Sequence, residues 1–218
     1  MIPLFHDFEG ETVLVVGGGP VGARKARRFA READVVALSP EFADADFGDA
    51  ERVQAAPEPG DATEWVDRTE PALVVAATDD EAVNDAFVAA ARAAGALVNR
   101  ADESGGREAD SVVVPATVRD DPVTVAVATG GASPALSKYL RERLEDDLAG
   151  AGGMADLTAS LRAELKAAGV DPETRRDAVR AVVRSEPVWK GLRTGGTNPR
   201  QVADDVVADV VGNSEWST

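Results

Sequence analysis

The sequence contains no cysteine and only one histidine, His6, among its 218 residues. Disulfide bonds, thiolate metal ligands and a cysteine nucleophile are therefore excluded. A structural zinc site cannot be assembled either, because its usual ligands are cysteine and histidine. A Ser-His-Asp triad would have to use His6, and no serine lies near it in the sequence. We accordingly expect no metal site.

Basic residues are scarce. The chain has 23 lysines and arginines against 39 acidic residues, and its net charge is -16. The electrostatic field of a negatively charged protein repels phosphate groups, which argues against binding to nucleic acid or to anionic membranes. The excess of acidic residues with few lysines resembles the composition of proteins from salt-loving organisms, where salt screens the self-repulsion.

Long apolar runs are also missing. No run approaches the roughly 20 residues that a membrane-spanning helix requires. The first ten residues, MIPLFHDFEG, have neither the positive start nor the apolar stretch of a secretory signal peptide. We therefore expect a cytoplasmic protein that does not enter a membrane.

The first hundred residues alternate between short apolar runs, rich in valine, and segments with helical spacing of apolar residues. This pattern predicts a doubly wound parallel sheet of the Rossmann type, with right-handed crossovers. Strands are predicted at 12–16, 34–40, 51–57, 72–80 and 96–102, and helices at 20–33, 61–67 and 81–94, with Gly95 ending the last helix.

The pattern changes after residue 110. Two strands joined by the turn RDDP are predicted within 111–131, followed by a helix at 133–148 that begins at Ser133 and Pro134. The run AGAGG at 149–153 is interpreted as a flexible joint, and three helical segments follow it. We predict three parts, namely a Rossmann domain at 1–110, a small α+β segment at 111–149 and a helical domain at 150–218.

The most informative motif is a glycine turn that follows the first strand directly. Gly17, Gly19 and Gly22 fit the pattern G-x-G-x-x-G, and Pro20 and Val21 begin the next helix. In this setting the three glycines permit a tight turn, close approach of a pyrophosphate, and close packing of helix on strand. The motif predicts a dinucleotide at the helix N-terminus, with these five residues as its binding residues. The alternative is a glycine turn that only packs the helix on the sheet.

The end of the second strand normally carries an acid that binds a ribose hydroxyl. Here Ser39 occupies this position, followed by Pro40 and Glu41. A serine hydroxyl can also bind the ribose, and no arginine is present to accept a 2′-phosphate. We assign these three residues to the cofactor site and favour NAD over NADP, although this position does not settle the choice.

Four segments carry a resemblance to a known family. They are PLFHDFEGETVLVVGGGPVGARKA (3–26), VVAATDDEAVN (74–84), LVNRAD (97–102) and VAVATGGASPALSKYLRERLE (125–145). In this order they resemble the siroheme synthase family, which comprises precorrin-2 dehydrogenases and sirohydrochlorin ferrochelatases. The resemblance covers residues 2 to about 150, and the C-terminal helices agree with the family only in length and helical character.

The resemblance implies an activity and a set of partners. The family oxidises precorrin-2 to sirohydrochlorin, both tetrapyrroles, and passes the hydride to NAD. Some members also insert Fe²⁺ as a second substrate. The family is homodimeric, and the segment after the Rossmann domain is exchanged between subunits, which implies a dimerisation role for 111–149. An exposed pair of strands would suit that role.

The resemblance also implies site residues. It places Asp102 as the catalytic acid or base, Thr129 in the active site, Asn99 beside the substrate and Thr78 at the cofactor. Asp102 would follow a strand at the carboxyl edge of the sheet, where ligands of such folds bind. Further substrate contacts are expected at the paired glycines and at the N-cap that follow Thr129, namely Gly130, Gly131 and Ser133, because open backbone and a helix start suit carboxylates.

Several points stay open. The loop between Asp102 and Pro115 is longer than the family spacing, so Asp110 is a rival for the catalytic role. Arg24 and Lys25 belong to the family signature and would serve the diphosphate or a substrate carboxylate, while the other arginines of this helix form a solvated face. A non-catalytic module that senses NAD(H), and a dehydrogenase of another small substrate, are the alternative functions.

Overall fold

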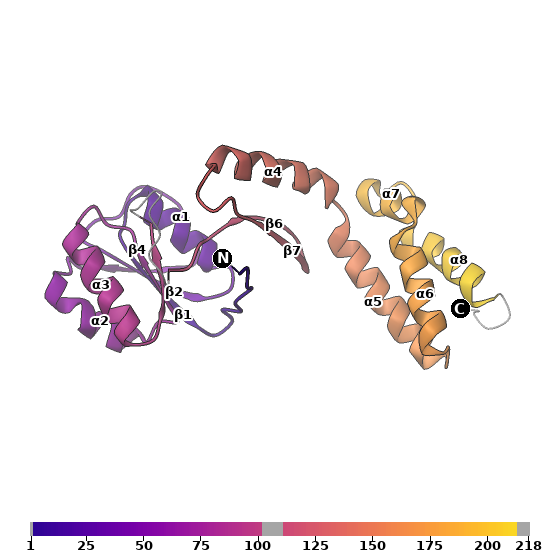
Figure 1. The fold of residues 1–218 in the computed structure, drawn as a ribbon, viewed down its shortest axis with the longest axis horizontal. Coiled ribbons are helices and arrows are strands. Elements are labelled where there is room, and N and C mark those ends of the chain that lie inside the picture. The colour runs from indigo at the N-terminus through magenta and orange to yellow at the C-terminus, as the bar shows by residue number, and fades with distance from the viewer. Residues whose placement is uncertain (1, 102–110, 213–218) are drawn as a thin grey trace. The chain divides into compact units, whose positions relative to one another are not determined.

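The computed structural model describes residues 2–101 and 111–212. The chain divides into two compact units. The first comprises residues 1–114 together with 130–132, and the second comprises 115–129 together with 133–218. Figure 1 shows the elements of both units.

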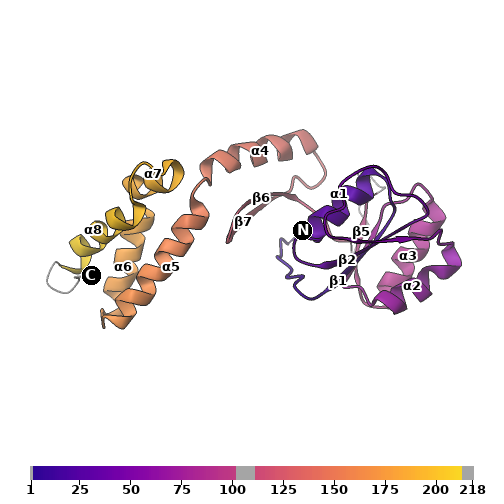
Figure 2. The ribbon, with the colours of Figure 1, turned by 180° about the vertical axis from the view of Figure 1, so that it is seen from behind.

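A parallel sheet forms the centre of the first unit. Its strand order is β3-β2-β1-β4-β5, and every neighbouring pair runs parallel. Figure 2 labels β5, the edge strand opposite β3. This confirms the predicted doubly wound sheet. The strands are β1 (Thr12–Val16), β2 (Asp34–Ser39), β3 (Glu51–Gln54), β4 (Leu73–Ala76) and β5 (Leu97–Arg100).

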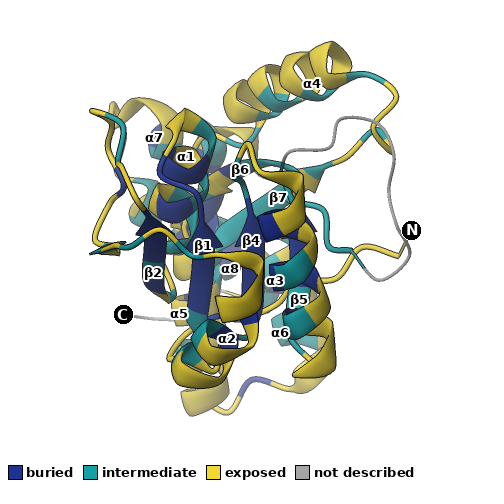
Figure 3. Cartoon of the chain, turned by 90° about the vertical axis from the view of Figure 1, so that its left-hand side faces the viewer, coloured by how far each residue is buried: buried dark blue, intermediate teal, exposed yellow. Residues whose placement is uncertain are grey.

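Apolar side chains cover both faces of this sheet. Along β1, Val13 and Val15 belong to the core on one face, and Leu14 and Val16 belong to the core on the other. All four are completely buried, as the dark colour of β1 in Figure 3 shows. A strand that is buried on both faces has an unbroken run of apolar residues, and this run is the reason that β1 could be predicted from the sequence.

Three helices and one loop close the two faces. Helix α1 (Pro20–Phe29) packs on the Val13 face. Helices α2 (Ala62–Thr69) and α3 (Glu81–Ala93) pack on the other face. No helix lies between β2 and β3; the loop that joins them instead buries the ring of Phe47 on the α1 face. α3 ends as predicted at Gly95, which has a φ of 78° and completes a Schellman cap.

The second unit begins with an antiparallel pair, β6 (Ala116–Asp120) and β7 (Val123–Val127), as expected from the RDDP turn. Helix α4 (Pro134–Asp147) follows. Four helices then pack around a core of their own: α5 (Ala151–Ala167), α6 (Pro172–Val183), α7 (Glu186–Thr194) and α8 (Pro199–Val211).

Two sequence-based expectations were wrong here. Residues 151–153 do not form a flexible joint, because they are the first turn of α5. A Cβ at Gly152 would lie 2.2 Å from the carbonyl oxygen of Asp121, so this glycine permits close packing on the β6–β7 turn. Within residues 150–212 there are four helices where three were expected. The short α7 was not predicted, although a proline in its first turn marks its start. No helix in the described ranges is long and apolar enough to cross a membrane.

Candidate nucleotide-binding site

A pocket of about 590 Å³ opens at the carboxyl end of the parallel sheet. It lies where β1 ends between β2 and β4, the point at which the strand order reverses and where open α/β sheets bind ligands. The structure brings eight of the nine predicted cofactor residues into its lining: Gly17, Gly19, Pro20, Val21, Ser39, Pro40, Glu41 and Thr78.

The three motif glycines have different surroundings. Gly17 has a φ of 130°, and a Cβ there would lie 2.3 Å from the carbonyl oxygen of Ala77. Gly22 does not line the pocket; a Cβ on it would lie 1.9 Å from the carbonyl oxygen of Gly17. Gly19, in contrast, has no atom within 4 Å of the place a Cβ would occupy. Gly17 and Gly22 are therefore required by packing, and Gly19 leaves open space at the pocket.

Gly18 is a site residue that the motif did not reveal. A Cβ at this position would lie 2.0 Å from the carbonyl oxygen of Glu41. The carbonyl oxygen of Gly18 also accepts a hydrogen bond of 2.8 Å from the backbone N–H of Ala43. Gly18 therefore holds the loop after β2 against the glycine turn. The motif leaves this position unspecified, and only the run of three glycines could have indicated it.

The start of α1 is suited to an anion. Gly19 is its N-cap residue, and no side chain caps the helix, whereas the carboxylate of Asp80 caps α3 by accepting from the N–H groups of Ala82 and Val83. Uncapped N–H groups and the positive end of the helix dipole favour a phosphate. The diphosphate of a dinucleotide fits this end of the pocket.

Ser39 supplies a second polar group. Only 7% of the residue is exposed, and its hydroxyl has no hydrogen-bond partner among the residues that the structure describes. Buried hydroxyl groups are normally hydrogen-bonded. A ribose hydroxyl would complete this one. The residues present therefore fit a dinucleotide at both the diphosphate and the ribose.

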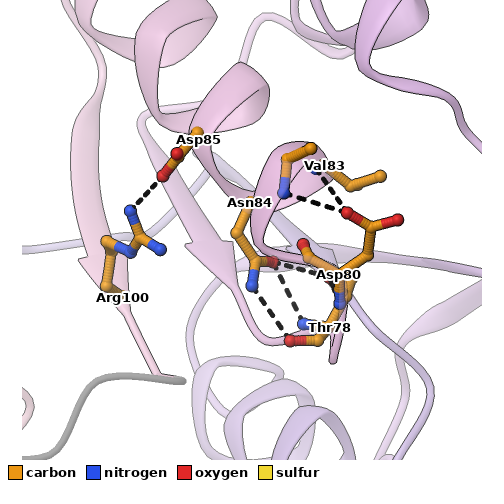
Figure 4. Close-up of polar contacts among 7 residues, drawn as sticks. Thr78, Asp80, Val83, Asn84, Asp85 and Arg100 are labelled. Atoms are coloured by element: carbon orange, nitrogen blue, oxygen red, sulfur yellow. Dashed lines mark hydrogen bonds and ion pairs between the residues drawn. The ribbon is translucent and has the colours of Figure 1, made fainter.

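A buried asparagine fixes the wall of the pocket that carries Thr78. Asn84, 1% exposed, donates a hydrogen bond of 2.9 Å to the carbonyl oxygen of Thr78. Its Oδ1 accepts from the N–H of Thr78 at 3.2 Å and lies 2.8 Å from the hydroxyl (Figure 4). Asn84 thus holds Thr78 as a rigid part of the wall. Asn84 is the last residue of the segment 74–84 that carries the family resemblance, but no role was predicted for it.

Asn99 and Lys25 form a polar contact on the α1 face of the sheet. The ammonium of Lys25 donates to Oδ1 of Asn99 at 2.8 Å, and Nδ2 of Asn99 donates to the carbonyl oxygen of Val112 at 2.8 Å. Asn99 is 6% exposed. Through these two hydrogen bonds its amide links α1, β5 and the backbone at Val112. Neither Lys25 nor Arg24 lines the nucleotide pocket.

Burial changes the titration of Lys25. Its pKa falls from 10.5 to about 8 because desolvation disfavours the charged ammonium, and the positive charges of Arg28 and Arg24 lower it further. At pH values above about 8 the neutral amine therefore becomes populated in the folded protein.

This lowered pKa gives a testable pH dependence. Between about pH 8 and 10.5 the unfolded chain still holds the proton that folded Lys25 has released, so the free energy of unfolding rises with pH in this window. We expect a rise of roughly 2 kcal/mol, less than the full shift would give because Lys25 is only partly buried. Urea unfolding across this pH range should show the rise in the free energy of unfolding in the wild type and not in Lys25→Met. The control is Lys166→Met, an exposed lysine; if Lys25→Met keeps the wild-type slope, the assignment is wrong.

Thr129 organises the turn before α4. Its Oγ1 lies 3.0 Å from the carbonyl oxygen of Ser133 and 3.0 Å from Oγ of Ser137, and it accepts a hydrogen bond of 3.3 Å from the N–H of Ser133. Ser133 in turn caps α4 by accepting from the N–H of Leu136, as predicted. Gly130 and Gly131 between them both have positive φ.

The two candidate catalytic acids, Asp102 and Asp110, lie outside the described residues. Their described neighbours in the chain are anchored on the sheet. The N–H of Ala101 donates to the carbonyl oxygen of Ala76 at 2.8 Å, beside Ala77 in the pocket wall. The N–H of Val112 donates to the carbonyl oxygen of Val98 at 2.7 Å.

A parallel sheet of this order, with a glycine turn and an uncapped helix start at its switch point, defines a Rossmann-type dinucleotide-binding protein. A family model described as NAD(P)-binding matches residues 4–116, and one described as sirohaem biosynthesis protein central matches 120–147. The chain is 30% identical to precorrin-2 dehydrogenase of Methanosarcina barkeri, over 98% of this chain and 96% of that protein. The chain belongs to the family of siroheme synthases and precorrin-2 dehydrogenases.

Other relatives are longer. Siroheme synthase of Chromobacterium violaceum is 39% identical over 80% of this chain but only 37% of its own length. The chain thus spans little more than a third of this relative. Among solved structures, SirC, a precorrin-2 dehydrogenase, superposes with a TM-score of 0.68 at 21% identity, over 94% of this chain and 98% of that one. The two proteins share a fold.

Proposed function

We propose that this protein is an NAD-dependent precorrin-2 dehydrogenase, which oxidises precorrin-2 to sirohydrochlorin in the cytoplasm. The observation that carries the proposal is the pocket at the switch point. Its uncapped helix start, the open space at Gly19 and the hydroxyl of Ser39, which has no partner among the described residues, match a dinucleotide. The full-length similarity to the Methanosarcina barkeri enzyme supports the choice of substrate.

The chemistry divides between cofactor and protein. Bound NAD supplies the hydride acceptor. The start of α1 would hold its diphosphate, and Ser39 would hold a ribose hydroxyl. The oxidation also releases a proton, and a carboxylate close to the reacting carbon can accept it. We assign this role to Asp102, because the chain reaches it one residue after Ala101, which is bonded beside the pocket wall.

We assign different roles to the other predicted residues of the active site. The amide of Asn99 is buried and engaged by Lys25 and Val112, so we propose that it positions the chain at the end of β5. The hydroxyl of Thr129 is engaged within its own turn, so it would orient Gly130 and Gly131. The open backbone of Gly130 would then receive a carboxylate of the tetrapyrrole, near the α4 start that Ser133 caps.

We further propose that the protein is a homodimer built around α4. This 14-residue helix has no buried residue, and Leu136, Tyr139 and Leu140 are exposed by 46%, 54% and 37% at helical spacing. The adjacent β6–β7 pair has only two strands, too few to be stable without further packing. A second copy of the chain would cover this apolar stripe.

The dimer is expected to depend on the apolar stripe. Leu140→Glu would place a charge in the interface, and light scattering after size-exclusion chromatography should show a monomer at micromolar concentration. Lys138→Glu changes the charge of the same helix on a side chain that is 72% exposed, and it should stay dimeric. A wild-type protein that is monomeric in this measurement refutes the proposed dimer.

Turnover tests the function directly. Purified protein is mixed with precorrin-2 and NAD⁺ in buffer of high salt, and the absorbance of sirohydrochlorin and of NADH is followed. We expect both to appear in equal amounts. Fe²⁺ is then added, and the siroheme spectrum reports whether the second reaction of the family occurs. Binding of NAD(H) without oxidation of precorrin-2 would refute the enzyme and favour the NAD(H)-sensing module.

A further inference from the structure

The helical part of the second unit contains a cavity that the proposed reaction does not use. It has a volume of about 570 Å³ and lies between α5 and α6. Four arginines line it, Arg162 on α5 and Arg175, Arg176 and Arg180 on α6. A volume of this size is within the range of small-molecule sites.

The concentration of positive charge is unusual for this chain, in which acidic residues outnumber basic ones by 39 to 23. Guanidinium groups stay charged at all physiological pH values, so four of them around one cavity repel each other. Among the described residues only Arg180 of the four has a carboxylate partner, Asp177. An arginine cluster in an acidic protein therefore indicates a bound anion more strongly than the same cluster would in a basic one.

Most hydrogen-bond donors of these arginines remain available. Arg180 pairs with Asp177 at 2.8 Å, and Nε of Arg176 donates to the carbonyl oxygen of Pro172 at 3.2 Å. The guanidinium groups of Arg162 and Arg175 make no hydrogen bond or ion pair with any residue in the described part of the chain. Each guanidinium has five N–H donors and is shaped to bind a carboxylate through two of them.

The cavity also has an apolar component. Pro172, Val179 and Val183 complete its lining, and Val183 is 41% exposed. Valine surface between guanidinium groups suits a ligand that has an apolar body and anionic substituents. An inorganic anion would leave this surface uncovered.

We propose that the arginine cavity binds a tetrapyrrole polycarboxylate, through its acidic substituents and one edge of its ring system. The choice of this ligand class rests on the proposed function, because precorrin-2 and sirohydrochlorin both carry several carboxylates on an apolar macrocycle. Each arginine that binds a carboxylate contributes a charge-assisted hydrogen bond, and its loss weakens binding about tenfold.

The test uses uroporphyrin, a fluorescent tetrapyrrole polycarboxylate, titrated into the full-length protein at fixed high salt. We expect Arg175→Gln and Arg162→Gln each to weaken binding about tenfold. The matched control is Arg184→Gln, which removes the same charge from the end of α6 but lies outside the cavity. Circular dichroism melting of all variants verifies folding.

The outcomes separate this inference from the proposed function. Equal affinity of the cavity variants and the control overturns the site, even if precorrin-2 is oxidised normally. Competition by sulfate alone that is as strong as competition by a second polycarboxylate porphyrin also overturns it. Selective loss of binding in the cavity variants supports the site even in a protein that fails to oxidise precorrin-2, which would refute only the dehydrogenase.

Discussion

Gly22→Ala is expected to weaken binding of the dinucleotide strongly and to destabilise the protein. The added methyl group would lie 1.9 Å from the carbonyl oxygen of Gly17, and this neighbour is backbone, which cannot rotate away. α1 must then shift off the sheet, which costs about 1–3 kcal/mol and lowers the melting temperature by several degrees. The same shift displaces the helix start from the pocket, so we expect NAD⁺ affinity to fall at least about a hundredfold, a loss of roughly 3 kcal/mol.

Gly19→Ala gives the matched contrast. No atom of the described protein lies within 4 Å of its added methyl group, and Gly19 has an ordinary φ of -75°. We therefore expect its stability to stay within about 1 kcal/mol of the wild type. The methyl group would occupy space that a diphosphate needs, so affinity for NAD⁺ should still fall by about tenfold or more.

Isothermal titration with NAD⁺ and thermal unfolding measured on the same samples separate the two roles. If Gly19→Ala binds NAD⁺ as the wild type does, the open space at this residue is not the diphosphate site. If Gly22→Ala keeps its melting temperature, the close contact with Gly17 is not a packing constraint.

The contrast between these glycines shows what the sequence could and could not reveal. The spacing of Gly17, Gly19 and Gly22 is a local pattern on one turn, and a pocket does lie at this turn. The requirement for Gly18 arises from Glu41, which the fold brings to the turn from the end of the next strand. No local pattern reports a contact of this kind.

Lys25 illustrates the same limit. It lies among arginines on α1, and the sequence suggested a role at the diphosphate or at a substrate carboxylate. The structure places its ammonium on Asn99, which is 74 residues away in the chain. Such a partner depends on how α1 crosses the sheet, and periodicity within the helix does not determine this crossing. The alternation of strands and helices, in contrast, was sufficient to predict the five-stranded sheet.

Asp102→Asn is expected to cause the largest loss of turnover. If Asp102 accepts the proton released during oxidation, an amide in its place removes general-base catalysis, which contributes about 10²–10⁴ in rate. The kcat for precorrin-2 oxidation should fall by this amount, while the affinity for NAD⁺ and the melting temperature stay unchanged. Asp110→Asn is the control, because it removes the same charge from the other candidate acid.

The two variants decide between the two acids. A large loss in Asp110→Asn with a normal Asp102→Asn would transfer the role to Asp110. The described chain is anchored on the sheet at Ala101 and again at Val112, on either side of the segment that contains both acids. Equal turnover of both variants and the wild type would remove the carboxylate from the mechanism, and the released proton would then have to pass to water or to a group of the substrate.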